Sequence, residues 1–258
     1  MELYYKNNQS SKSNAVDLRI ESSDVHIWQM QHDVFVKEKH KFSALLSDEE
    51  YKKAKSFQFE EDKTRYIICH GFLRILLAGY LKIKPDILKF CYGKFGKPYI
   101  NNVGAENINF NISYSNNLLL VVISCENKVG IDVEYMREIN EMDQIVEAFF
   151  TDNEKMFFRE VPEDEKISIF FRLWTRKEAF LKGLGTGILK PLDEIEVVSS
   201  GKTKFVLGLG TEIIKIGSWY IKDLKVKKGY SAALALECDP DSIQLKFFTS
   251  ISEYSTCH

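Results

Sequence analysis

The chain has few cysteines, and their spacing gives them no obvious shared role. Cys69, Cys91, Cys125, Cys238 and Cys257 are scattered over 258 residues and form no C-x-x-C pair. This distribution argues against a zinc knuckle, a dithiol redox motif and a disulfide framework. It favours a reducing environment for the protein.

Long apolar runs and an excess of charge are also absent. No segment approaches the ~20 apolar residues that span a bilayer, and residues 1–14 lack the apolar core of a signal peptide. We therefore expect a cytoplasmic protein with no membrane partner. The formal net charge is only −2, and basic and aromatic residues do not interleave as in RNA-binding motifs, so no nucleic-acid partner is predicted.

Histidine is scarce, which limits the catalytic options. The five histidines lie outside the acidic and glycine-rich segments described below, so no Ser/His/Asp triad is predicted; they are His26, His32, His40, His70 and His258. The turn at residues 93–98 does not have the spacing of a Walker A loop.

Against these absences, 45% of the residues are hydrophobic, enough for a substantial core. Residues 1–22 form a polar, weakly ordered extension in this reading. The predicted helices cover 47–59, 62–81 and 165–182, with capping boxes at Ser47 and Thr151. The predicted strands are 25–30, 110–113, 118–124, the Asp132 segment, 195–198, 218–226 and 230–237.

Three carboxylates and one lysine carry the chemical signal. Asp132 and Glu134 are two residues apart in a β-branched run, so on a strand they point to the same face. Glu178 lies in a helical segment with Lys182 four residues later on the same face. Hard oxygen ligands beside an ammonium group suit a magnesium ion that holds a phosphate.

Simpler interpretations exist for each pair. Asp132 and Glu134 could decorate the solvent face of an edge strand, and Glu178 with Lys182 could form an ordinary surface ion pair. We favour a metal site because the strand segment is otherwise apolar, and because Trp174 and the apolar residues after Glu178 indicate a partly buried helix face.

In order along the chain, these segments resemble the 4′-phosphopantetheinyl transferases. The closer resemblance is to the large monomeric type represented by the surfactin-synthetase activator. It rests on F-G-K-P-Y-I at 95–100, F-N-I-S-Y-S at 110–115, G-I-D-V-E at 130–134 and W-T-R-K-E-A-F-L-K at 174–182, and it covers roughly residues 24–240. Ser47 to Arg65, Pro191-Leu192 and Trp219 to Ala235 also look similar.

The resemblance implies an α+β fold: a pseudo-dimer of two similar halves, each an antiparallel sheet packed with a long helix. The implied halves are residues 23–125 and 126–258, with the active site between them. It also implies transfer of the 4′-phosphopantetheine arm of coenzyme A to a serine of an apo acyl or peptidyl carrier protein, in nonribosomal peptide or polyketide biosynthesis. The enzyme would depend on Mg²⁺, with Mn²⁺ as an alternative, and act as a monomer.

Residue roles also follow from the resemblance. Asp132, Glu134 and Glu178 would be the magnesium ligands, Glu178 would also help to deprotonate the serine, and Lys182 would contact the phosphates. The implied coenzyme A contacts are Lys53 and Arg65 at the 3′-phosphate, Gly96, Lys97 and Pro98 along the adenine, and Ser113 and Tyr114 at the phosphates.

Two positions depart from the family. Tyr114 stands where the family has a histidine, which removes a potential positive charge from the phosphate site. Glu50 stands where a second lysine is expected at the 3′-phosphate. Two alternatives therefore stay open: a non-catalytic relative that binds coenzyme A or a carrier protein, and a different magnesium-dependent phosphotransferase.

Overall fold

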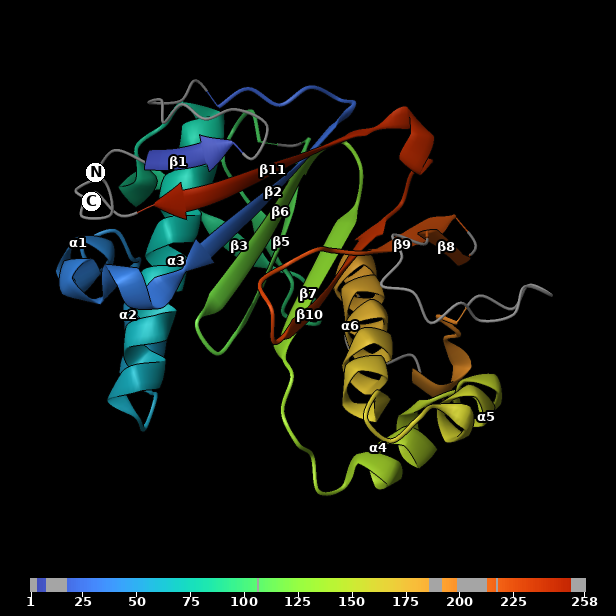
Figure 1. The fold of residues 1–258 in the computed structure, drawn as a ribbon. Helices are drawn as coiled ribbons and strands as arrows, with labels where there is room; N and C mark the ends of the chain where they lie inside the picture. The colour runs from blue at the N-terminus through green and yellow to red at the C-terminus, as the bar shows by residue number, and fades with distance from the viewer. Residues whose placement is uncertain are drawn as a thin grey trace.

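The structure is a computed structural model in which two sheets each carry a long helix (Figure 1). It describes residues 4–7, 18–105, 107–185, 192–198, 213–216 and 218–251. Within these residues, no helix combines the length and apolar character needed to cross a membrane.

The larger sheet unites the beginning, middle and end of the chain. Its strands lie in the order β1-β11-β2-β6-β5. They are β1 (Tyr4–Asn7), β2 (Asp24–Gln31), β5 (Ile108–Ser115), β6 (Leu118–Cys125) and β11 (Gln244–Ile251). The β11–β2 pair is parallel and the other pairs are antiparallel. The prediction of weak order is therefore wrong for the four residues of β1, which pair with β11.

The long helix α3 (Glu60–Leu81) packs on this sheet, accompanied by α1 (Lys39–Ser43) and α2 (Asp48–Lys55). The predicted capping box at Ser47 is confirmed: Ser47 Oγ accepts the Glu50 N–H at 3.3 Å, and Glu50 Oε2 accepts the Ser47 N–H at 2.8 Å. Helix α2 ends at Lys55, four residues before the predicted end.

The smaller sheet has the strand order β7-β10-β9-β8. Its strands are β7 (Val129–Tyr135), β8 (Ile213–Ile216), β9 (Trp219–Asp223) and β10 (Tyr230–Leu236), all antiparallel to their neighbours. The long helix α6 (Lys166–Leu184) packs on it, with α4 (Met142–Phe149) and α5 (Asp152–Glu160) at one end (Figure 1). The capping box at Thr151 is confirmed.

The remaining short elements connect these layers. A hairpin of β3 (Phe90–Tyr92) and β4 (Pro98–Ile100) encloses the predicted 93–98 turn. Short 3₁₀ helices cover His32–Glu38, Pro85–Ile87, Leu192–Glu194 and Pro240–Ser242.

The predicted strand at 195–198 is wrong. Side chains rather than a neighbouring strand satisfy its backbone: Glu154 Oε1 accepts the Val197 N–H at 2.8 Å, and Arg176 Nη1 donates to the Val197 carbonyl at 3.1 Å. A periodicity argument cannot detect this kind of side-chain support.

Among the described residues, buried apolar side chains form three cores. On β7, Val129, Ile131 and Val133 face the core between the two sheets, while Gly130, Asp132 and Glu134 take the alternate positions, where Gly130 abuts α6. The core between α3 and the larger sheet and the core between α6 and the smaller sheet complete the layers. The predicted fold class, two α+β halves each with a sheet and a long helix, is thus confirmed, and the division at residue 126 stays a prediction. In addition, β11 pairs with β2, so the C-terminal part of the chain contributes a strand to the sheet of the N-terminal half.

Candidate active site

The predicted carboxylates lie where β5, β7 and α6 meet. Asp132 is only 1% exposed, and its Oδ1 accepts hydrogen bonds from Ser113 Oγ at 2.9 Å and from Lys182 Nζ at 2.5 Å. Lys182 Nζ also donates to Ser113 Oγ at 3.0 Å. Ser115 Oγ donates to Glu134 Oε2 at 2.8 Å. Strand β5 therefore reaches both carboxylates of β7 through its serines.

Gly130 allows β7 and α6 to approach closely at this point. A Cβ built on Gly130 would lie 2.0 Å from the Ala179 carbonyl oxygen and 2.3 Å from the Gly183 nitrogen. Since those atoms belong to the helix backbone, no side-chain rearrangement would make room. The glycine of the G-I-D-V-E segment therefore sets the distance between the Asp132 strand and the Glu178 helix.

The carboxylates influence one another electrostatically. Burial, together with the negative charge of Asp132, raises the pKa of Glu178 and the pKa of Glu134 above the ordinary glutamate range. The positive charge of Lys182 acts in the opposite direction on both. The three acidic groups and Lys182 thus form one electrostatic unit.

The donor set suits a magnesium ion chemically, although the side chains are not arranged as a finished metal site. Among the described residues, no three His, Cys, Asp or Glu side chains gather closely enough to hold a metal as they stand. Lys182 lies against Asp132 instead. However, Asp132 Oδ2 is buried without a hydrogen-bond partner, and the charge of Asp132 raises the pKa of the Glu134 and Glu178 carboxyl groups. A buried carboxylate oxygen without a hydrogen-bond partner fits a divalent cation.

A pocket of about 220 Å³ joins the predicted segments of both halves. Its lining residues are Phe95, Gly96, Lys97, Pro98, Asn111, Ile112, Glu178, Leu181, Lys182 and Gly185. The structure therefore brings Gly96, Lys97 and Pro98, from the β3–β4 loop, to the same cavity as Glu178 and Lys182 of α6.

Lys97 connects the β3–β4 loop to the end of helix α6. Its Nζ donates to the Gly183 carbonyl at 2.8 Å and to the Val129 carbonyl at 3.2 Å. Burial, with a smaller contribution from the charge of Lys128, lowers the pKa of Lys97 to about 8. The Gly183 and Val129 carbonyl groups therefore hold the Lys97 amino group in place at the pocket wall.

The predicted residues at the 3′-phosphate are more dispersed. The Arg65 guanidinium lies 5.5 Å from the centre of the Tyr114 ring and pairs with Asp62, so Arg65 and Tyr114 are neighbours. Lys53 is exposed on α2, with its Nζ 5.7 Å from the centre of the Phe57 ring. Neither Lys53, Arg65 nor Tyr114 lines the 220 Å³ pocket.

Glu50, which stands where the family is expected to have a second lysine at the 3′-phosphate, lies inside the protein. Glu50 is 2% exposed, and its Oε2 accepts a hydrogen bond from Arg74 Nε at 2.6 Å while it also caps α2. Arg74 is equally buried. A residue at this position points into the protein, where its charge is compensated by Arg74 and not by a ligand.

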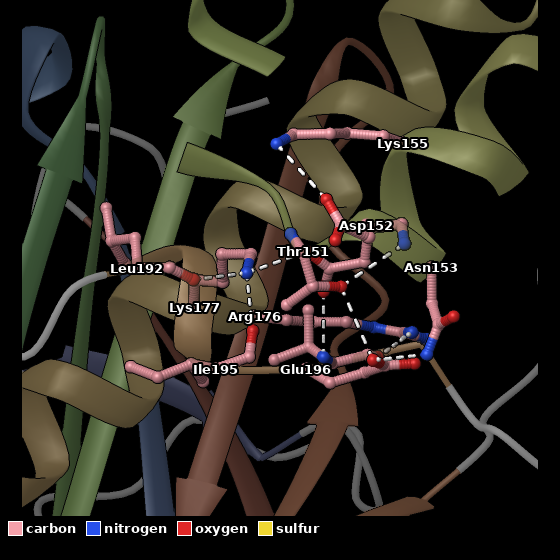
Figure 2. A network of polar contacts seen from close by, with 11 residues as sticks. Thr151, Asp152, Asn153, Lys155, Arg176, Lys177, Leu192, Ile195 and Glu196 are labelled. Carbon is pink, nitrogen blue, oxygen red and sulfur yellow. Dashed lines mark hydrogen bonds and ion pairs between the residues drawn. The ribbon is translucent and has the colours of Figure 1, made fainter. Parts of the chain in front are cut away.

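Lys177, the neighbour of Glu178, is fully buried. Its Nζ lies 2.7 Å from Glu154 Oε2. It also donates to the carbonyl oxygens of Leu192 and Ile195 (Figure 2). Glu154 caps α5 through the Thr151 N–H at 2.9 Å. This network fastens α5 and the 192–197 segment to the middle of α6, beside the Glu178 turn.

Sequence reasoning missed two polar residues of the site, Asn111 and Ser115. Both belong to the alternating N-I-S-Y-S segment, in which every second side chain is polar. That alternation was a visible signal that one face of the strand meets polar groups.

The chain is similar in sequence to known proteins over most of its length. Residues 29–127 match the family model described as 4′-phosphopantetheinyl transferase, N-terminal, and residues 128–235 match that of the 4′-phosphopantetheinyl transferase superfamily. The 4′-phosphopantetheinyl transferase HetI of Nostoc sp. is 38% identical over 182 residues, which is 70% of this chain and 76% of the relative.

Two further relatives carry the same activity in their names. The 4′-phosphopantetheinyl transferase Sfp of Bacillus subtilis is 26% identical over 205 residues, covering 80% of this chain and 88% of the relative. The 4′-phosphopantetheinyl transferase gsp of Aneurinibacillus migulanus is 31% identical over 159 residues, covering 60% and 64%. The chain belongs to the 4′-phosphopantetheinyl transferase family and is an enzyme of that class.

Proposed function

We propose that the protein transfers the 4′-phosphopantetheine arm of coenzyme A to a serine of an apo acyl or peptidyl carrier protein. The transfer releases 3′,5′-ADP and depends on Mg²⁺, or on Mn²⁺ in its place. The observation that supports this best is the 220 Å³ pocket, which places the Gly96-Lys97-Pro98 loop of one half beside Glu178 and Lys182 of the other. One chain supplies both sides of the pocket, so the enzyme is proposed to act as a monomer.

The binding roles divide between the two halves. Gly96, Lys97 and Pro98 form the wall for the nucleotide, and the half-buried Lys97 ammonium contributes positive charge there. Arg65 and Tyr114 form a neighbouring polar pair for the 3′-phosphate and the pyrophosphate, and the exposed Lys53 of α2 supplies a further cation for the 3′-phosphate. A tyrosine supplies a neutral hydroxyl donor, so the positive charge in that pair comes from Arg65.

Asp132, Glu134 and Glu178 would hold the divalent cation. Bound there, the cation would neutralise negative charge on the phosphate oxygens. The Lys182 ammonium group lies next to the acidic residues at the end of a flexible side chain. When the substrate binds, Lys182 leaves Asp132 and donates to a phosphate oxygen. Ser113 remains hydrogen-bonded to Asp132 and keeps that carboxylate oriented.

The transfer itself is a displacement at phosphorus. The serine Oγ of the carrier attacks the β-phosphorus of coenzyme A, the bond from that phosphorus to the bridging pyrophosphate oxygen breaks, and 3′,5′-ADP leaves. Glu178 accepts the serine proton, and the raised pKa of this carboxylate makes it a better base. Positioning and charge neutralisation supply most of the rate enhancement.

Substitution of the acidic residues tests this assignment. Asp132→Asn and Glu178→Gln should each reduce transfer by at least about 100-fold, the scale of losing one charge-stabilising group, while circular dichroism stays native. Release of 3′,5′-ADP, followed by chromatography, identifies the reaction. Another nucleotide product would favour a different phosphotransferase. Coenzyme A binding with no product in the wild type would favour a non-catalytic relative.

A further inference from the structure

The two sheets meet at β5 and β7, which are not paired as strands in either sheet. Side chains of β5 bridge them instead. Asn111 Oδ1 accepts a backbone N–H at 2.8 Å, Ser113 Oγ accepts one at 3.3 Å and Ser115 Oγ accepts one at 3.1 Å. The donors are the N–H groups of Ile131, Val133 and Tyr135. Polar side chains at every second position thus replace the carbonyl groups of an ordinary strand neighbour.

Two of these three side chains also hold a carboxylate. Ser113 Oγ donates to Asp132 Oδ1 at 2.9 Å, and Ser115 Oγ donates to Glu134 Oε2 at 2.8 Å. In each case the carboxylate belongs to the residue that precedes the N–H donor: Asp132 precedes Val133, and Glu134 precedes Tyr135. The serine therefore contacts the strand and its acidic side chain together.

The number of protons fixes the direction of these bonds. A serine hydroxyl has one proton and two acceptor positions. Because Ser115 Oγ accepts the backbone N–H, its single proton is free to point at Glu134. Ser113 Oγ accepts both the Val133 N–H and Lys182 Nζ, so its proton must go to Asp132. One oxygen of each carboxylate is held by this contact, and Asp132 Oδ2 is left without a partner.

We propose that Ser113 and Ser115 are positioning residues that orient Asp132 and Glu134 for the divalent cation by anchoring them to the strand of the opposite half. Closure of the two halves on one another and orientation of the metal ligands are then the same structural event. This inference rests on the proposed function and goes beyond it, since it gives Ser115 a role and makes both serines the link between β5 of one half and the acidic residues of β7 in the other.

Asn111 provides a matched comparison within the same bridge. It makes the shortest of the three backbone contacts and touches neither carboxylate. Loss of the Asn111 carboxamide should therefore weaken the junction of the two sheets without releasing a metal ligand. Loss of the Ser115 hydroxyl should weaken the junction and also release Glu134 from its hydrogen bond. Ser115 is partly exposed, so threonine, which retains the hydroxyl, can be accommodated there.

The test measures Mn²⁺ binding directly, by electron paramagnetic resonance of the free ion in the presence of coenzyme A, together with the melting temperature. Ser115→Ala should weaken Mn²⁺ binding about 10- to 100-fold, as is typical when a ligand loses its orienting hydrogen bond. Ser115→Thr should restore most of the affinity. Asn111→Ala should lower the melting temperature at least as much as Ser115→Ala. At saturating coenzyme A it should reduce the Mn²⁺ affinity much less than Ser115→Ala does, because Asn111 lines the pocket but its hydrogen bond goes to the Ile131 N–H and not to a carboxylate.

Two results would overturn the inference while leaving the proposed function intact. One is wild-type Mn²⁺ affinity in Ser115→Ala; the other is an equal loss of affinity in Ser115→Ala and Asn111→Ala, which would show that only the junction matters. A wild-type protein that binds no Mn²⁺ yet transfers the arm would overturn both the metal assignment and this inference. Absence of transfer by a wild type that binds Mn²⁺ would overturn the proposed function alone.

Discussion

At the scale of single residues, Lys182 occupies the position where a cation is expected. Its ammonium group is 2.5 Å from Asp132 Oδ1, and this contact compensates a carboxylate that is almost completely buried. A buried carboxylate without a counter-charge is costly. The lysine therefore stabilises the acidic cluster of the described structure, and phosphate binding would require it to change partner.

Replacement of Lys182 should make the protein more dependent on a divalent cation for stability. Lys182→Met is expected to lower the free energy of unfolding by about 1–2 kcal/mol in EDTA, since Asp132 loses a charged hydrogen-bond partner that is itself partly exposed. Adding Mg²⁺ should raise the melting temperature of this variant more than that of the wild type. Lys128→Met removes the same charge from an exposed lysine and serves as the control. Equal Mg²⁺ shifts in all three proteins would contradict the prediction.

The lowered pKa of Lys97 predicts a pH dependence for coenzyme A. Below pH about 8 the Lys97 ammonium is charged, and above this value it becomes neutral. Because the phosphates of coenzyme A attract a cation, kcat/KM for coenzyme A should fall as the pH rises through about 8. Lys97→Arg keeps its charge to much higher pH, so its decline should move upward. Superimposable pH profiles of the two proteins would exclude a charge role for Lys97.

At the scale of secondary structure elements, the close contact of β7 with α6 determines the site. Ala233 and Ala235 of β10 and Gly130 of β7 present little or no side chain on the face toward α6. Small residues allow a helix to approach a sheet closely, and any added volume must displace backbone. The position of Glu178 relative to Asp132 is thus a consequence of residues that have no chemistry of their own.

Gly130→Ala tests this contact. Its methyl group would lie 2.0 Å from the Ala179 carbonyl oxygen, so the strand and helix must separate. We expect a loss of at least about 3 kcal/mol in unfolding free energy, at or beyond the upper range for overpacked cores, measured by urea denaturation. Gly93→Ala is the matched control, because its Cβ would meet only the Lys97 carbonyl at 3.7 Å. Similar stabilities for the two variants would show that β7 and α6 can shift freely.

Most of these elements could be predicted from the sequence, because the signals for them lie within a few neighbouring residues. Capping boxes and helical stripes depend on residues three or four apart, so Ser47, Thr151 and the α3 and α6 segments were predicted correctly. The strand prediction for 195–198 was wrong because the side chains that hydrogen-bond to this backbone, Glu154 and Arg176, are about 20 to 45 residues away in the sequence. No periodicity records such a distant partner.

The site was predictable in part for the same reason. Alternation placed Asp132 and Glu134 on one face, and helical spacing placed Glu178 with Lys182. The meeting of β5 with β7 is a long-range contact, so Ser115 had no role until the structure showed its hydrogen bond to Glu134. The enclosure of Lys177 by Glu154 and by the Leu192 and Ile195 carbonyl groups likewise depends on residues that are distant in the sequence.

At the scale of the whole molecule, β11 joins the C-terminal part of the chain to the N-terminal sheet. It pairs in parallel with β2, and Phe248 stacks on the fully buried Trp28 with ring centres 4.5 Å apart. Lys246 pairs with the buried Asp24 at 2.7 Å. The two halves are therefore connected at β11 as well as at the β5–β7 junction.

Truncation before β11 should destabilise the N-terminal sheet, although the removed residues lie at the other end of the chain. Deleting residues 240–258 exposes Trp28 and leaves Asp24 without Lys246, so we expect a loss of at least about 3–5 kcal/mol, comparable with removing one large buried aromatic side chain. Tryptophan fluorescence during urea unfolding measures it. Deleting only residues 252–258, which leaves β11 whole, is the control. Unchanged stability of the longer deletion would mean that β11 contributes little.

The central claim is that the pocket between the halves carries out phosphopantetheinyl transfer with the help of a divalent cation. Intact-mass spectrometry of an apo carrier protein incubated with the enzyme, coenzyme A and Mg²⁺, with and without EDTA, tests it most directly. We predict that the carrier gains the mass of one phosphopantetheine arm only when free Mg²⁺ is present. An unmodified carrier under all conditions, across peptidyl and acyl carrier classes and with coenzyme A bound to the enzyme, would contradict the account.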